Sequence, residues 1–187
     1  MKTRSILAAI AALTAVALAG CGEPASRAAP AAAAMRAGPS AVAALEATRG
    51  NSVTGTVSFQ QDGERTLVSA KVEGLKPGQE HGFHIHEKGD CSSGDGMSTG
   101  GHFNPGGKAH GAPDAEHHAG DLPALKADAQ GRADVKFVLS GVTIGSGAAD
   151  IVGKGLIVHA MPDDYRTQPT GNSGARIACA VITLKNA

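Results

Sequence analysis

The sequence has 187 residues, 17 basic and 17 acidic side chains, four phenylalanines, one tyrosine and no tryptophan. This length suits one globular domain with short additions. The composition argues against a nucleic-acid-binding protein. Basic residues do not cluster anywhere in the sequence, and few aromatic side chains are present to stack on bases.

The chain begins with a pattern typical of an exported protein. Two basic residues precede an apolar run from Ile6 to Leu18, which predicts a secretory signal peptide over residues 1–20. The run is shorter than the roughly 20 apolar residues of a membrane-spanning helix, which disfavours an uncleaved anchor. The letters LAGC at 18–21 resemble the bacterial lipobox, so we expect Cys21 to carry a lipid. A chance cysteine at an ordinary cleavage site is the alternative.

The segment that follows is rich in Ala, Pro and Gly. We expect residues 21–50 to be the anchor cysteine and a tether, and residues 51–187 to be the folded domain. The letters AVAALEA at 41–47 would also suit a short helix. In the oxidising compartment that export implies, the remaining pair Cys91 and Cys179 predicts a disulfide, with two buried free thiols as the alternative.

Short segments after residue 50 have the alternation or the composition of β-strands. QDGE at 61–64 separates the first two, as a hairpin turn would. No long helical pattern lies among them, so we expect an all-β antiparallel sandwich or barrel. The expected strands cover residues 53–59, 66–73, 81–87, 133–140, 155–160 and 176–184.

Two polar segments, 88–122 and 161–176, are unusual among these strands. Loops as long as the first are usually functional or disordered. All eight histidines follow residue 80, and those of GFHIHE at 82–87 point to one side of a strand because side chains alternate. His81 lies three positions before His84 and therefore faces away from them. Imidazoles with an aspartate and no free thiolates suit copper and zinc.

Six motifs resemble the copper-zinc superoxide dismutase family in order and nearly in spacing. They are GFHIHE, GGHFNP, KAHG, HAGDL, LIVHA and GNSGARIACAVI, and the resemblance as a whole covers residues 53–184. The resemblance implies a Greek-key antiparallel β-barrel or sandwich of about eight strands, with two long functional loops and one copper and one zinc per subunit. The implied copper ligands are His84, His86, His102 and His159; the implied zinc ligands are His102, His110, His118 and Asp121. His102 would bridge the two metals.

The same resemblance gives roles to other residues in the two loops. Asp163 would link a copper-ligand histidine to a zinc-ligand histidine, and the Cys91–Cys179 disulfide would tie the first loop to the last strand. Arg176 would be catalytic by attracting the anionic substrate beside copper, and Thr170 would narrow the same channel. His117 remains an alternative to its neighbour His118 as a zinc ligand.

The implied activity is that of an oxidoreductase that converts superoxide to dioxygen and hydrogen peroxide at a redox-cycling copper. We expect the protein to be a periplasm-facing lipoprotein of the bacterial cell envelope, held to a membrane by lipid on Cys21. The outer membrane is one of the two membranes that could hold it. Two other functions use the same residues: copper storage without turnover, and a structural zinc protein with vestigial copper ligands. Arg176 and the complete set of copper histidines favour the enzyme. A monomer and a homodimer both fit the sequence.

Overall fold

The computed structural model describes residues 38–185 of the chain. Along several strands in this part, buried and exposed side chains alternate. This part contains ten strands and one short 3-10 helix, η1, at Met97–Thr99. The strands are β1 (Ser40–Ala47), β2 (Thr54–Asp62), β3 (Arg65–Glu73), β4 (Glu80–His81), β5 (Phe83–His86), β6 (Leu125–Lys126), β7 (Ala133–Ser140), β8 (Gly155–His159), β9 (Arg176–Val181) and β10 (Thr183–Leu184).

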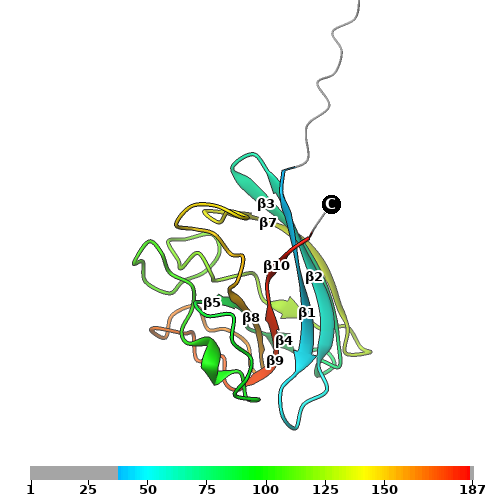
Figure 1. Ribbon diagram of the computed structural model, residues 1–187. Coiled ribbons are helices and arrows are strands. Elements are labelled where there is room, and N and C mark those ends of the chain that lie inside the picture. The colour runs from blue at the N-terminus through cyan, green and yellow to red at the C-terminus, as the bar shows by residue number, and fades with distance from the viewer. Residues whose placement is uncertain (1–37, 186–187) are drawn as a thin grey trace, which may run out of the picture. The chain divides into compact units, whose positions relative to one another are not determined.

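Eight of these strands form one curled antiparallel sheet (Figure 1). Its order is β5-β8-β9-β1-β2-β3-β7, with β10 beside β1, and the short strands β4 and β6 pair separately. The hairpin between β2 and β3 turns at residues 62–65, where Asp62 pairs with Arg65. The expected all-β antiparallel fold of about eight strands is therefore confirmed.

The inner face of the sheet holds the hydrophobic core. Along β3, Val68, Ala70 and Val72 are buried and alternate with more exposed residues. On β5, Phe83 and Ile85 are fully buried in the same core. Complete burial of such a side chain contributes about 1.5 to 3 kcal/mol, so the core fixes the direction in which each strand faces. The alternate residues of β5 are consequently turned to its other face.

The first strand corrects the expected domain boundary. Residues 40–47, assigned to the tether or to a short helix, form β1, which pairs with β2 on one side and with β9 and β10 on the other. Ala41, Ala43 and Leu45 lie at alternate positions and are buried in the core. This burial and pairing outweigh the high helix propensity of Ala and Leu. The expected signal peptide and Cys21 lie outside the described residues.

Long connections cover the outer side of β5 and β8 (Figure 1). One runs from β5 to β6 and includes η1; the other runs from β8 to β9. The disulfide Cys91–Cys179 joins the first connection to β9, as predicted. No helix within residues 38–185 has the length and apolar character needed to cross a bilayer.

Candidate metal centre

The face of β5 opposite the core carries two buried histidines. His84 and His86 alternate with Phe83 and Ile85, and none of the four is exposed to solvent. Strand β8 pairs with β5 and ends at His159, whose backbone N donates to the Gly82 carbonyl over 2.8 Å. The neighbouring strand therefore brings a third imidazole to the same face.

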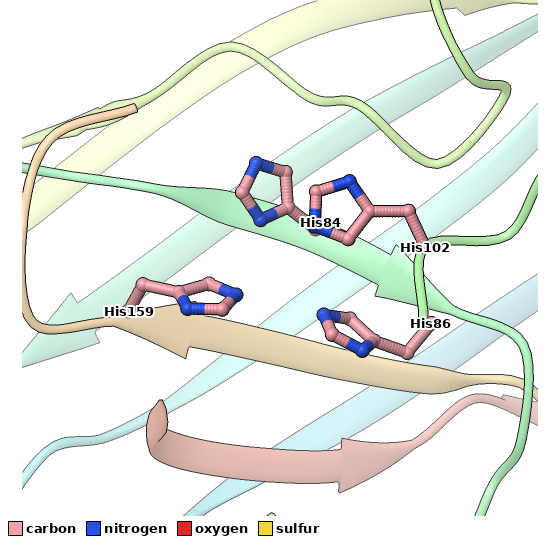
Figure 2. Close-up of side chains that lie close together, drawn as sticks. All are labelled: His84, His86, His102 and His159. Atoms are coloured by element: carbon pink, nitrogen blue, oxygen red, sulfur yellow. The ribbon is translucent and has the colours of Figure 1, made fainter. Parts of the chain in front are cut away.

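A fourth imidazole reaches this face from the long connection. His102 forms an isolated bridge with His86, and its ring stacks on that of His84 with centroids 4.0 Å apart. In Figure 2 the rings of His84, His86, His102 and His159 surround a common space above β5 and β8. One ring nitrogen from each of the four lies within 4.8 Å of the other three. We call these residues the four-histidine group.

Hydrogen bonds orient the rings of the four-histidine group. Nδ1 of His86 is 2.9 Å from the Gly100 carbonyl, and Nδ1 of His159 is 3.1 Å from the Gly174 carbonyl. Each carbonyl requires a donor, so the protons lie on these nitrogens. Nε2 of both rings is buried without a hydrogen-bond partner, and so are His84 Nδ1 and His102 Nε2. Four buried lone pairs aimed at one space fit a bound metal ion.

A second group adjoins the first through His102. Its members are His102, His110, His118 and Asp121, all buried, with ligand atoms within 4.8 Å of one another. His110 Nδ1 lies 3.0 Å from Asp121 Oδ2, and His118 Nδ1 lies 3.3 Å from Asp121 Oδ1. Neither nitrogen has a hydrogen-bond partner, so these are close contacts without hydrogen-bond geometry. We call this the histidine–aspartate group, and its donor set also fits a metal ion.

His102 belongs to both groups because its two nitrogens face in different directions. Nδ1 lies 2.7 Å from Asp121 Oδ1, whereas Nε2 belongs to the set of unpartnered nitrogens. A single imidazole thus connects the two candidate metal positions.

Asp163 connects the two groups a second time, from the connection between β8 and β9. Its Oδ2 lies 2.6 Å from His84 Nε2, and its Oδ1 lies 2.9 Å from His110 Nε2. The two hydrogen bonds leave Nδ1 of each ring to face its own group. Asp164, next in sequence, is exposed, and its side chain bonds only to Arg166 and Thr167.

Burial keeps His84, His86 and His159 of the four-histidine group uncharged at neutral pH. The pKa of His86 falls to about 2, because burial, followed by the charges of Arg176 and His102, disfavours protonation. Burial lowers the pKa of His159 to about 4. The pKa of His84 lies well below its ordinary value because of burial and the adjacent His102. The lone pairs are therefore free for a cation rather than occupied by protons.

The carboxylate of the second group is ionised. Burial acts to raise the pKa of Asp121, but the hydrogen bond and charge of His102, together with His110 and His118, lower it below its ordinary range. Burial lowers the pKa of His118. The histidine–aspartate group thus offers imidazoles and one negative charge, whereas the four-histidine group offers imidazoles alone.

Arg176 opens β9 beside the four-histidine group. Its guanidinium donates to the Gly96 carbonyl and to Thr99 Oγ1 from one nitrogen, and to the Gly100 carbonyl from another, at 2.7 to 2.8 Å. The Gly100 carbonyl also accepts from His86 Nδ1. Arg176 thereby braces the segment that orients His86. Three of the five guanidinium N–H groups are engaged and two remain for another partner.

The remaining candidates lie around these groups without joining them. His117, the alternative to His118 as a zinc ligand, is not in the histidine–aspartate group; its Nδ1 is bonded to the His118 carbonyl. His81 is buried on β4, and its Nδ1 bonds to the His159 carbonyl over 2.8 Å. Thr170 is half-buried in the connection between β8 and β9.

Several contributors escaped the sequence reasoning. The Gly100 and Gly174 carbonyls orient two rings, but a backbone carbonyl has no sequence signature. Gly171 has φ +64°, and a Cβ there would collide with Asp163 and His110. Its place in the GNSG motif could have pointed to such a close approach. Gln168, which bonds to the His110 backbone, had no signal at all.

The fold and the site define an antiparallel β-sandwich protein with two histidine groups, joined through His102, that could each hold a metal ion. Residues 53–182 match the family described as copper/zinc superoxide dismutase. The chain belongs to this family.

Solved structures of similar proteins carry different names. The clock protein EA4 is 36% identical with a TM-score of 0.72, over 78% of this chain and 94% of that one. A SOD-like protein from Bacillus subtilis is 38% identical with a TM-score of 0.68, over 75% and 96%. Its double mutant, with a tyrosine and a proline replaced by histidine, is 39% identical with a TM-score of 0.67, over 76% and 96%. Family membership therefore leaves the activity to be argued from the site.

Proposed function

We propose that this protein disproportionates superoxide, taking two superoxide anions and two protons to one dioxygen and one hydrogen peroxide. The observation that carries the proposal is the set of four buried imidazole nitrogens without partners beside an arginine with free donors. A protein that only stored a metal would have no use for an anion-binding guanidinium there.

The two groups differ in the metal that they would hold. His84, His86, His102 and His159 would hold copper, since imidazole ligands suit this metal. Three imidazoles and a carboxylate in the histidine–aspartate group would hold zinc, for which this donor set is suited, and the zinc would have a structural role. Bound copper would supply the one-electron redox chemistry, alternately accepting an electron from superoxide and returning one.

His102 is the residue that would transfer a proton to the substrate. Asp121 fixes the ring through Nδ1, so Nε2 is the atom that can take up a proton and release it to the reduced substrate.

Arg176 would bind the substrate anion. Burial lowers the pKa of its guanidinium, yet arginine stays charged at physiological pH. The two free N–H groups can donate to a small anion while the other three hold the loop. A preformed cationic site of this kind allows rates near the diffusion ceiling, about 10⁸ to 10⁹ M⁻¹s⁻¹, that fall as salt screens the attraction.

The activity is tested with the purified chain reconstituted with copper and zinc, at low and high salt. We expect fast turnover that falls with salt, falls in Arg176→Ala and is nearly lost in His102→Ala. Arg132→Ala is the matched control, because Arg132 is exposed and paired with Asp128 at 3.3 Å. Bound copper without turnover would refute the dismutase and leave a copper-storage protein.

We also propose that the protein is an exported lipoprotein of the bacterial cell envelope, anchored through Cys21. The N-terminal pattern supports this location, and so does the disulfide, which persists in oxidising compartments. Mass spectrometry of the mature protein from a bacterial host is expected to find a lipid-modified Cys21 at its N-terminus. An unmodified cysteine, or an N-terminus elsewhere, would overturn the assignment.

A further inference from the structure

The side chain of Gln168 bonds to both backbone groups of His110. His110 N donates to Gln168 Oε1 over 2.9 Å, and Gln168 Nε2 donates to the His110 carbonyl over 2.8 Å. The residues are 58 positions apart, on the two different long connections. A side-chain amide that both accepts from and donates to one residue reproduces the exchanged pair of an antiparallel ladder.

His110 depends on this partner because it lies outside regular structure. No helix or strand falls between Thr99 and Leu125. Among the described residues, neither backbone group of His110 bonds to another backbone group. Gln168 therefore supplies the pairing that a neighbouring strand would give, and it fixes the peptide from which the imidazole extends.

The His110 ring is constrained on both sides, because each of its nitrogens lies close to a carboxylate. Its Nε2 lies 2.9 Å from Asp163 Oδ1, and its Nδ1 lies 3.0 Å from Asp121 Oδ2. Both carboxylates are buried, so a small rotation of the peptide would weaken one contact or the other. The backbone must be held as well as the ring.

Gln168 is itself presented by an ordered turn. Asp164 Oδ1 accepts from the backbone N of Arg166 and of Thr167, at 2.9 and 2.8 Å. The Thr167 carbonyl then accepts from Gly171 N over 2.7 Å. The turn thus holds Gln168 between two fixed points.

We propose that Gln168 is a positioning residue for the histidine–aspartate group, acting through His110 to slow the escape of the metal from this group. The inference rests on the proposed metal binding by His102, His110, His118 and Asp121. It assigns Gln168 no contact with the metal. Residues that orient a metal ligand typically change metal affinity by about 10- to 100-fold when they are replaced.

The probe is Co²⁺ placed in the histidine–aspartate group of the full chain, followed by Zn²⁺. Gln168→Leu removes both hydrogen bonds at similar bulk. Gln168→Glu keeps the acceptor for His110 N but sets a carboxylate oxygen against the His110 carbonyl. Gln60→Leu is the matched control, since Gln60 donates to the Gly38 carbonyl over 2.7 Å and contacts neither group.

We expect both Gln168 variants to alter the visible Co²⁺ absorption and to release Zn²⁺ to a chelator about tenfold faster, while Gln60→Leu changes neither. A loss of general stability alone would leave the Co²⁺ spectrum unchanged. A normal spectrum and release rate in both Gln168 variants would overturn the inference. No tetrahedral Co²⁺ spectrum in the unmodified protein would instead refute the metal binding on which the inference depends.

Discussion

Replacement of Asp163 by alanine tests how firmly one carboxylate holds the two groups together. Its oxygens accept from His84 Nε2 and His110 Nε2, at 2.6 and 2.9 Å, and all three side chains are at most 1% exposed. The alanine variant would leave two buried ring N–H groups unpaired. Each such loss costs about 1 to 3 kcal/mol, so we expect the free energy of unfolding to fall by about 2 to 6 kcal/mol.

The assay is urea unfolding of the metal-free chain, so that metal binding does not contribute to the difference. Asp164→Ala is the matched control, because Asp164 is exposed and its side chain bonds only to Arg166 and Thr167. We expect a clearly smaller loss in the control. Equal losses in the two variants would refute the reasoning, since the link between His84 and His110 would then contribute nothing of its own.

Other predictions concern the disulfide, the pH and the core. Cys91→Ser opens a link across 88 residues and should lower the unfolding free energy by about 4 to 5 kcal/mol in the chain-entropy model. The His159 pKa of about 4 lies below the unfolded value of 6.5, so between these pH values the unfolded chain binds the extra proton. Metal-free stability should therefore fall as the pH drops through this window, by up to about 1.4 kcal/mol per unit from this residue. Ile85→Ala should cost about 2 to 5 kcal/mol in urea unfolding, and Leu67→Ala, at an exposed position, about 0.5 kcal/mol or less.

Each of these expectations has a contrary result. Unchanged stability of Cys91→Ser under oxidising conditions would mean that the covalent link adds nothing to the native contacts. Stability that is flat or rises as the pH falls from 6.5 to 4 would contradict an uncharged His159 in the folded state. Similar costs for Ile85→Ala and Leu67→Ala would contradict the assignment of Ile85 to the core.

Strand alternation made much of the fold readable in advance. The face shared by His84 and His86 followed from period-two geometry, because Phe83 and Ile85 must turn toward the core. The region of β1 was misjudged because Ala and Leu favour helices locally, while the pairing that makes it a strand comes from segments far away. Local propensity carries no information about a distant partner.

The site was predictable where side chains act and hidden where the backbone acts. Histidines and an aspartate with motif spacing could be picked out, and the structure gathers them into two groups. The Gly100 and Gly174 carbonyls could not, since every residue has a carbonyl and only the folded path shows which ones face a ring. Gln168 was hidden for the same reason, because its partner is a peptide.

Strand β1 also has a consequence for the order of folding. One edge of β1 pairs with β2, which is close in sequence. The other edge pairs with β9, where Glu46 lies opposite Cys179, 133 residues later in the chain. When two segments lie this far apart, the chain loses loop-closure entropy before the contacts between them form, and this slows folding. Until β9 arrives, β1 presents an open edge that another chain could join. This domain therefore closes late, when its last strands reach its first.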